Sequence, residues 1–501
     1  MDTKVAVGED RRIGMADGRP ATRVDVAISG RLEGFVGPDG ARSEIFSDVP
    51  EFTLGQYANT GPYHHAVTEY SGDKGSGFVL LHPEKAEDWD GRLWLVVHGA
   101  ISYPTLGDLA PRETGRFNPR LGRDDYVALL LDRGSAVAFT RRASTMGPKD
   151  DETAVGDDGT VFEHLTYIYF PGIMRDYAAV AQRLVEDRLG RRPSRTYLYG
   201  HSAGAGIAHL LNYAPGRNRD ASGERIFDGF IADDTGLGYY LPTLVVDGTD
   251  VLFTDEASRA DMVPQIDLVH AAHVGDDGTS LWRKRENYRL LLDKGVASKS
   301  RHYEVSGSSH FDAGRVEWIA GIPGLGDGFG QYADENLDLT GVVDALVDVL
   351  QDWVEDGREP PPSRSGEPDL DGSGNGPLEL PEIACPTGVY YPYPEGSSGT
   401  RMSGQLTAFA AYDGTLPEPV DGRGQLLDMN GNGVADRRES VEEAWRRRGR
   451  DGARTGVLAA DESFTEQSMS DCVEIVARDL VADRLLSTVA GEAYRERVTR
   501  G

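Results

Sequence analysis

The spacing of apolar and polar positions changes along the chain, and this change predicts its layout. Residues 1–90 carry short alternating runs such as "TRVDVAISG" and "GSGFVLLHP", which are typical of antiparallel strands that pack on a core. From residue 91 onward, short apolar runs alternate with stretches of helical period, for example "RLWLVVHGA" and later "IMRDYAAVAQRLVEDRLG". Strands and helices in alternation form βαβ units, so we expect an α/β fold with a mostly parallel central sheet and helices on both faces.

A proline-rich run marks the predicted end of this α/β region. The amphipathic pattern "TGVVDALVDVLQDWVEDG" predicts a helix, and "REPPPSRSGEPD" at 358–369 follows it as a predicted linker. We therefore expect one catalytic α/β domain over 91–357, with an insertion at 235–262. The remaining segment, 370–501, contains helical patterns and predicts an α-rich C-terminal extension.

Charge and cysteine content narrow the classes of partner and location. The chain has 52 basic and 82 acidic residues, a net charge of −30. Such a surface repels phosphate backbones and anionic lipid, so we expect neither nucleic acid nor a membrane as partner. The first thirty residues lack the apolar core of a signal peptide, which favours a cytoplasmic location. Cys385 and Cys472 are too few for a disulfide scaffold or a cysteine metal site, but they can pair with each other.

One short motif carries chemistry. The stretch "RTYLYGHSAGAGIAHLLNY" at 195–213 places Ser202 between two glycines, after a predicted strand and before a predicted helix. A serine at such a turn needs a strained backbone, and side chains on the flanking positions would clash with the crossing strand and helix. Ser202 then stands at a helix N-terminus, where the helix dipole favours a developing oxyanion. We predict that Ser202 is a nucleophile.

A serine hydroxyl needs a base, which in this arrangement comes later in the chain. His310 follows the predicted strand "RHYEV" after a Gly-Ser turn, and it is the predicted base. His209 lies on the helix after the serine and is interpreted as structural, whereas His302 lies at the wrong end of its strand. The other downstream histidines are His270 and His273.

The sequence leaves open which carboxylate orients the base. Asp276 and Asp277 follow the apolar run "IDLVHAA" and are the predicted acids, because a carboxylate at a strand end can accept from the imidazole. Asp250 is a rival, but "LPTLVVDGTDVLF" resembles a β-hairpin with an Asp-Gly turn. Asp233 and Asp234, after "FDGFIA", are the third possibility.

An oxyanion hole needs two backbone N–H groups. Ala203, next to the nucleophile, is predicted to supply one of them. The loop after "LWLVV" is predicted to supply the other, from Gly99 or Ala100, because "HGA" resembles the HG signature of esterases.

These residues together resemble the α/β-hydrolase superfamily. "GHSAGA", "YEVSGSSH" and "DWVEDGREPPPSR" resemble a group of large bacterial α/β-hydrolase-domain proteins, and "LPEIACPTGVYYPYP" extends the likeness into the C-terminal segment. The resemblance implies an α/β-hydrolase fold with Ser202 as nucleophile and His310 as base. It does not supply the acid, because "AAHVGDD" departs from the usual Gly-x-x-Asp form at that strand end.

A second motif predicts a metal site. "DMNGNGVADRRE" matches a calcium loop, in which oxygen ligands at alternate positions surround a hard cation and Gly433 permits the sharp turn. The earlier "DGSGNGPLELPE", which begins at Asp371, fits the same spacing, but its prolines forbid a following helix and favour a plain linker. The predicted ligands of the calcium loop are Asp428, Asn430, Asn432, Val434, Asp436 and Glu439.

The sequence therefore predicts a serine hydrolase that cleaves a small-molecule carboxylic ester through an acyl-enzyme. No cofactor is expected for catalysis, and Ca²⁺ is expected in a structural role. An amidase or acyltransferase would use the same residues. The alternative from another class is an inactive, calcium-stabilised binding or assembly protein on a hydrolase scaffold. The sequence does not indicate an oligomeric state.

Overall fold

The structure is a computed structural model that forms two units. The first unit contains Met1–Asp267 and Glu286–Arg301, and the second contains Leu268–Arg285 and His302–Gly501. The residues that the structure describes are 4–15, 18–36, 42–43, 64–70, 77–98, 126–141, 154–155, 161–163, 171–213, 218–220, 222–235, 245–246, 249–250, 262–270, 280–295, 297–308, 310, 337–367, 370–385 and 465–499.

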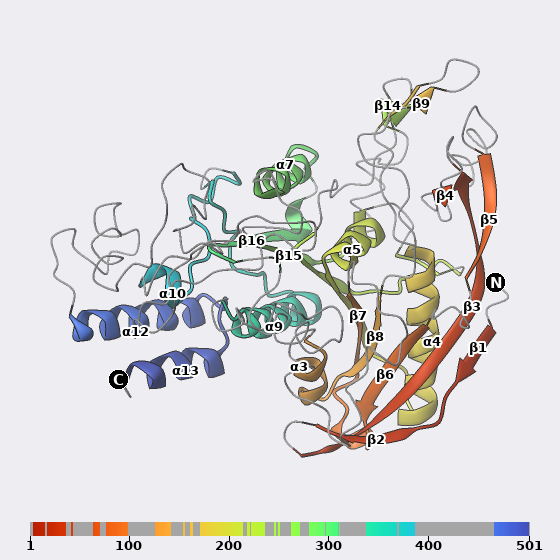
Figure 1. The fold of residues 1–501 in the computed structure, drawn as a ribbon, viewed down its shortest axis with the longest axis horizontal. Helices are drawn as coiled ribbons and strands as arrows, with labels where there is room; N and C mark the ends of the chain where they lie inside the picture. Colours follow the sequence, from red (N-terminus) through yellow and green to blue (C-terminus); the bar gives the residue numbers. More distant parts are fainter. Residues whose placement is uncertain are drawn as a thin grey trace, which may run out of the picture. The chain divides into compact units, whose positions relative to one another are not determined.

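A large sheet, with parallel strands at its centre, organises the fold (Figure 1). Its order is β1-β3-β6-β8-β7-β11-β12-β15-β16, and β2, β4 and β5 pair with β3 off this path. Strands β8, β7, β11 and β12 run parallel to one another, as the alternation of strands and helices predicts. The strands are β1 (Lys4–Val7), β2 (Arg11–Gly14), β3 (Pro20–Val36), β4 (Arg42–Ser43), β5 (His64–Tyr70), β6 (Gly77–Pro83), β7 (Arg92–His98), β8 (Ala136–Arg141), β11 (Arg195–His201), β12 (Gly229–Asp233), β15 (Gln265–His270) and β16 (Ser300–Val305).

The N-terminal strands extend this sheet instead of forming a layer of their own. Strand β3 pairs antiparallel with β1, β2, β5 and β6, and β6 pairs antiparallel with β8. The predicted antiparallel strands of residues 1–90 are thus confirmed, and β6 joins them directly to the parallel centre.

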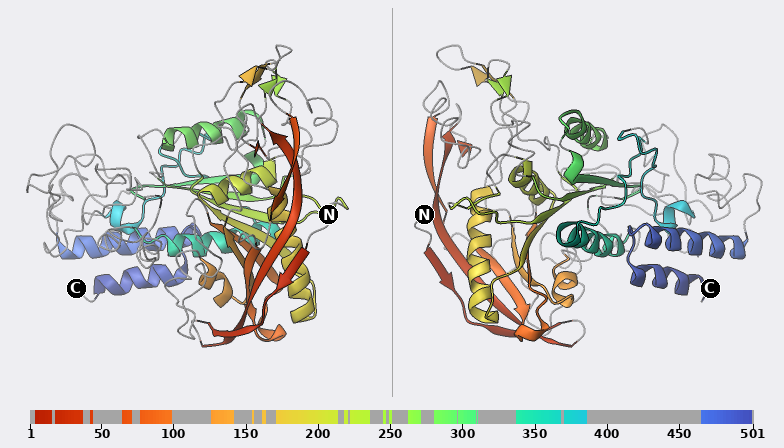
Figure 2. Two further views of the ribbon diagram at one scale, coloured as in Figure 1. Left: turned by 45° about the vertical axis from the view of Figure 1, so that its right-hand side comes forward. Right: turned by 180° about the vertical axis from the view of Figure 1, so that it is seen from behind.

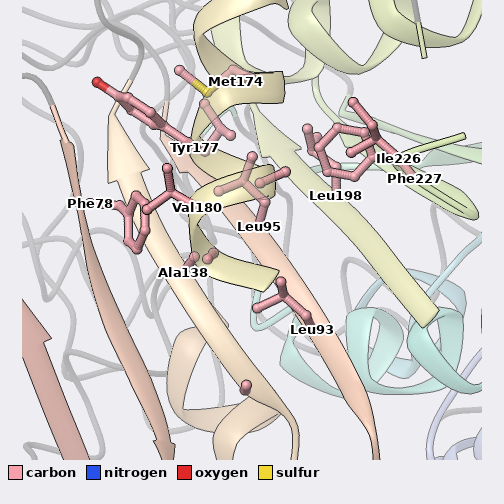
Figure 3. Packing of buried hydrophobic residues seen from close by; sticks show 14 of the residues in the cluster. Phe78, Leu93, Leu95, Ala138, Met174, Tyr177, Val180, Leu198, Ile226 and Phe227 are labelled. Carbon is pink, nitrogen blue, oxygen red and sulfur yellow. The ribbon is translucent and has the colours of Figure 1, made fainter. Parts of the chain in front are cut away.

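Helices cover both faces of the parallel strands. Leu95, Leu198 and Phe230 lie in one apolar cluster with buried residues of α4 (Pro171–Leu189) and α5 (Ala203–Tyr213). Figure 3 shows Leu95 and Leu198 in this cluster with Met174 of α4. Successive strand residues point to opposite faces, so Tyr199 lies on the other side from Leu198. There it meets Tyr126, at the start of α3 (Val127–Asp132), with ring centroids 5.3 Å apart. The predicted α/β class with helices on both faces is confirmed.

A small second sheet accounts for part of the predicted insertion. Its order is β14-β13-β10-β9, with antiparallel pairing throughout. Strands β13 and β14 form a hairpin around "DG", as the sequence predicts. The strands are β9 (Ala154–Val155), β10 (Val161–Glu163), β13 (Val245–Val246) and β14 (Thr249–Asp250).

In the second unit, β16 pairs with Arg364 of the predicted linker 358–369 and with Leu378 beyond it. The Arg364 N–H donates to the carbonyl of His302 at 2.8 Å, and the Leu378 N–H donates to the carbonyl of Glu304 at 2.7 Å. Pairing is parallel at both positions. Proline lacks an N–H and is tolerated at a sheet edge, so a proline-rich run does not have to be a free linker.

Helices make up the rest of the described second unit. The amphipathic α9 (Thr340–Asp356) ends at Gly357, whose φ of 69° terminates the helix as predicted. Helices α12 (Glu466–Ala482) and α13 (Thr488–Thr499) lie side by side (Figure 2). A disulfide joins Cys385, which follows α10 (Pro381–Ala384), to Cys472 of α12, with Cα atoms 5.9 Å apart.

The disulfide bears on the predicted location. Cys385 and Cys472 are both fully buried and paired, and disulfides persist mainly in oxidising compartments. The cytoplasmic location expected from the sequence stays a prediction. In the described part of the chain, no helix has both the length and the apolar character that a membrane span requires.

The remaining helical elements are α7 (Ser280–Asp293) and two single 3₁₀ turns, Ala86–Asp88 and Ala297–Lys299.

Candidate active site

Ser202 stands at the junction of strand β11 and helix α5. The strand ends at His201 and the helix begins at Ala203, so the predicted strand-turn-helix context is confirmed. The φ of Ser202 is 58°, in the left-handed region that residues with a side chain adopt only at a free-energy cost. Ser202 is 6% exposed. A strained serine at this position indicates a functional constraint, because strain of this kind persists mainly where surrounding structure enforces it.

The two glycines of the motif are required by close packing. A Cβ atom on Gly200 would overlap the carbonyl of Gly204, and one on Gly204 would overlap the carbonyl of Val97 in β7. Backbone atoms cannot rotate aside as a flexible side chain does, so either substitution must displace the turn itself. The predicted role of the glycines is confirmed for both positions.

The neighbouring strand holds the serine backbone. His201 and Asp233 are register partners at the ends of the parallel strands β11 and β12. The Ser202 N–H continues this ladder and donates to the Asp233 carbonyl at 2.9 Å. The next residue, Asp234, has a φ of 53° and is completely buried. Two strained residues thus follow two adjacent strand ends.

The predicted donors of an oxyanion hole are only partly within the described residues. Ala203 is the first residue of α5, and the Ser202 carbonyl accepts the N–H of Ala205 at 3.0 Å. N–H groups in a first helical turn have no partner within their helix and suit an anion. Gly99 and Ala100 lie outside the described residues, directly after the end of β7.

His310 lies in the second unit, after the end of β16. The intervening turn is held by the Ser308 hydroxyl, which donates to the Val305 carbonyl at 2.7 Å, and by Gly307, whose φ is 70°. His310 itself is 1% exposed. The predicted order of strand, Gly-Ser turn and histidine is therefore confirmed, whereas its role as base stays a prediction.

His209 is part of a buried polar network, in agreement with its structural interpretation. Its Nε2 lies 2.5 Å from Oδ1 of Asp267 in β15, and both side chains are 1% exposed. Gln265 donates to the same carboxylate oxygen at 3.2 Å, and Asn212 donates to Gln265 at 3.0 Å. On its other side, Nδ1 of His209 lies 3.4 Å from the Thr235 hydroxyl. The network ties α5 to β15 and to the residue that follows Asp234.

The comparison with family models decides the classification. A model described as "Alpha/beta hydrolase domain" matches residues 166–430, just over half of the chain. The chain belongs to this alpha/beta hydrolase family. The matched part of the hydrolase domain includes Ser202, Asp234 and His310.

Solved structures of other hydrolases resemble the chain at low identity. Esterase PE8 is 14% identical over 55% of this chain and 99% of its own, with a TM-score of 0.29. LpqC, a poly(3-hydroxybutyrate) depolymerase from Bordetella parapertussis, is 14% identical over 56% of this chain and 85% of its own, also with a TM-score of 0.29. A glucuronoyl esterase from Solibacter usitatus is 12% identical over 59% of this chain and 74% of its own, with the same TM-score. No curated protein matches the chain.

The candidate acids of this hydrolase fall in three places. Asp276 and Asp277 lie outside the described residues. Asp250 ends β14 in the small second sheet, as its hairpin interpretation requires. Asp233 and Asp234 lie at the end of β12 and are both completely buried. Within the described residues, only this last pair borders the nucleophile strand.

The predicted calcium loop at 428–439 lies outside the described residues. The earlier loop is described, and there the Asp371 carboxylate accepts the N–H of Ser373 at 2.9 Å, which is an Asx turn. In the ranges that the structure describes, no three or more metal-ligating side chains gather at one point. The interpretation of the loop at Asp371 as a plain connection stays a prediction.

Two features of the site escaped the sequence analysis. Asp267 is the buried partner of His209, and the Tyr199 hydroxyl donates to Oδ2 of Asp233. Polar residues in otherwise apolar strands, as in "QIDLVH" and "TYLYG", are the signal that could have indicated both contacts.

Proposed function

We propose that this alpha/beta hydrolase is a serine esterase with Ser202 as its nucleophile. The observation that supports the proposal most strongly is the backbone of Ser202, whose positive φ is held between β11 and α5 by glycines that no other residue can replace without displacing the turn. A serine with only a structural role has no need of this conformation.

The proposed mechanism has two steps. The Ser202 Oγ attacks the acyl carbon of the ester, and its proton passes to the imidazole of His310, the proposed base. The leaving alcohol departs with that proton, and an acyl-enzyme remains. Water then attacks the acyl carbon, gives its proton to the same imidazole and releases the acid as the Ser202 hydroxyl is restored. The N–H of Ala203 and one from Gly99 or Ala100 stabilise the oxyanion in each step.

The test is hydrolysis of p-nitrophenyl esters from acetate to laurate, with a benzoate, by wild type and Ser202→Ala. We expect Ser202→Ala to lose about 10⁴-fold or more in kcat with an unchanged melting temperature, because only the attacking oxygen is removed. Ser222→Ala is the matched control, since Ser222 is an exposed serine of the same unit and is expected to leave turnover unchanged. A parallel series with a calcium chelator tests whether the predicted loop at 428–439 affects stability.

Two outcomes would contradict the proposal. Equal turnover in wild type and Ser202→Ala would show that the activity does not use this serine. Absence of turnover and of covalent labelling in folded wild type would favour the inactive binding scaffold.

A further inference from the structure

A hydroxyl, an imidazole and a carboxylate form a buried hydrogen-bonded series within the first unit. The Thr235 hydroxyl lies 3.4 Å from Nδ1 of His209, and Nε2 of His209 lies 2.5 Å from Oδ1 of Asp267. All three residues are buried. A carboxylate oxygen accepts, so Nε2 of the imidazole donates to it, and Nδ1 of the neutral ring then accepts the Thr235 proton. The series therefore has one direction, from Thr235 to Asp267.

His209 lies too far along α5 to act on Ser202 directly. It comes seven residues after Ser202 in the same strand-turn-helix segment. A helix rises about 1.5 Å per residue, which places the two residues about 10 Å apart along the axis. An effect of His209 on the nucleophile must therefore pass through another residue that His209 contacts.

The turn after β12 connects Thr235 to the backbone of Ser202. Thr235 follows Asp234, whose φ is 53°, and the carbonyl of Asp233 accepts the N–H of Ser202 at 2.9 Å. A residue with a positive φ keeps it only where surrounding structure enforces it. The Asp233 carbonyl and the Thr235 hydroxyl make such contacts on the two sides of Asp234. Movement of Thr235 would therefore displace the acceptor that holds Ser202.

Asp267 is present at a cost in stability. Its Oδ1 accepts from His209 and, at 3.2 Å, from Gln265, whereas its Oδ2 is buried with no hydrogen-bond partner among the described residues. Burial of a carboxylate oxygen without a donor is unfavourable. An apolar residue at this position of β15 would avoid the cost but would remove the acceptor of Nε2. The orientation of the His209 imidazole is what the acid provides in return.

We propose that Thr235, His209 and Asp267 are positioning residues that hold the backbone of Ser202 for attack. The inference rests on the proposed function, because it assigns the residues that support the proposed nucleophile. Asp267 orients the imidazole, and the imidazole holds the Thr235 hydroxyl. The turn after β12 then keeps the acceptor of the Ser202 N–H in place. A misplacement of about 1 Å in a reacting group can cost about 10²-fold in rate.

The experiment compares Thr235→Val and His209→Phe with Tyr213→Phe, on the ester that wild type hydrolyses best. The Tyr213 hydroxyl of α5 lies 2.9 Å from that of Ser300, so its removal also costs α5 one buried hydrogen bond. Both phenylalanine substitutions keep the stacking of the two rings. We expect kcat to fall about 10-fold in Thr235→Val and about 10²-fold in His209→Phe, with little change in KM. Tyr213→Phe should lower the melting temperature similarly and leave kcat within about 2-fold of wild type. Thr235→Ser keeps the hydroxyl and should recover kcat.

Two further measurements separate positioning from a general loss of stability. Hydrogen exchange at the Ser202 amide should be faster in Thr235→Val and His209→Phe than in wild type and unchanged in Tyr213→Phe, because only the first two variants loosen the Asp233 carbonyl. The double variant Thr235→Val with His209→Phe should lose no more kcat than His209→Phe alone, because the two residues act through one contact.

A wild-type kcat in folded Thr235→Val and His209→Phe would overturn the assignment, as would an equal loss of kcat in Tyr213→Phe. If His209→Phe does not fold, the comparison of Thr235→Val with Thr235→Ser decides the question. If wild type shows no turnover that depends on Ser202, the proposed function fails instead. The exchange rate of the Ser202 amide still tests the positioning in that case, so the two failures are distinguishable.

Discussion

The strand ends at Ser202 and the edge of β16 differ in how they hold buried polar groups. At the strand ends, two residues are strained and glycines leave no room for change. At the β16 edge, a partly buried ion pair is matched by hydrogen bonds. Arg285 donates to both carboxylate oxygens of Glu304, at 2.9 and 2.6 Å, and the N–H of Gly366 adds a third bond at 3.0 Å.

The pKa shifts of Glu304 and Arg285 show that their hydrogen bonds outweigh the effect of burial. Burial opposes ionisation of Glu304, but the hydrogen bond from Arg285 and the N–H of Gly366 outweigh it and lower the pKa of Glu304 below its usual value. Burial likewise opposes the charge on Arg285, and the bond to Glu304 raises the pKa of Arg285. Bidentate pairs of this kind are among the stronger hydrogen bonds in proteins.

The difference suggests a division of labour between the two regions. Strained residues with tight glycines serve chemistry, whereas the Arg285–Glu304 ion pair and the disulfide serve stability. Substitutions at the strand ends should therefore abolish turnover, whereas substitutions at the β16 edge should lower the melting temperature and leave turnover intact.

The largest effect is expected at Gly204. A Cβ atom there overlaps the Val97 carbonyl, so Gly204→Ala must displace the turn that carries Ser202. We expect kcat/KM to fall by at least about 10²-fold, because small misplacements of a nucleophile are costly, and stability to fall by about 1–3 kcal/mol. Ester hydrolysis and thermal unfolding measure the two effects. Gly14→Ala is the control, because Gly14 has no atom within 4 Å of the added Cβ. Full activity in Gly204→Ala would contradict the claim that close packing requires a glycine at this position.

The next effect concerns the disulfide. Replacement of both cysteines, Cys385→Ser with Cys472→Ser, removes a cross-link that spans 87 residues of sequence. We expect a loss of about 2–4 kcal/mol in unfolding free energy with unchanged ester turnover at temperatures where the protein stays folded. Reduction of wild type should lower the melting temperature similarly and have no effect on the double variant. A loss of turnover in the folded double variant would contradict the division between the regions.

The smallest effect is expected at Glu304. Glu304→Gln keeps the shape but removes the charge that Arg285 matches, which should cost about 2 kcal/mol at pH 7. Because the pKa of Glu304 is lowered in the folded state, this contribution is present above the usual pKa of a glutamate and is lost as pH falls through the folded-state value. Denaturant unfolding of wild type and Glu304→Gln between pH 3 and 8 should therefore show a difference in unfolding free energy that becomes smaller in acid. Glu474→Gln, at an exposed site of α12, serves as control. A difference in unfolding free energy that does not change with pH would contradict this account.

The local signals of the sequence predicted the elements and the strand-turn-helix context of Ser202. Apolar periodicity located β7, β8, β11, β12 and β16, and the G-x-S-x-G spacing located Ser202, because both depend on residues close together in the chain. The place of Asp234 depends on which strand lies beside β11, and strand order is a property of the folded sheet. The closeness of Asp234 to the end of β11 could therefore not be predicted from the sequence.

Two further features depend on contacts between distant segments. The prolines at 360–362 resemble a linker in sequence, but the Tyr303 hydroxyl donates to the carbonyl of Pro361 at 2.7 Å, and Arg364, two residues after the run, pairs with β16. The pairing of His209 with Asp267 joins residues 58 positions apart, and composition alone does not indicate it.

The most direct test of the central claim is covalent labelling of Ser202 by a fluorophosphonate, followed by peptide mass spectrometry. Only an activated serine reacts rapidly with this probe. The account predicts one phosphonyl adduct on the peptide that contains Ser202 in wild type and no adduct in Ser202→Ala. Folded wild-type protein that stays unlabelled, or an adduct that persists in Ser202→Ala, would contradict it.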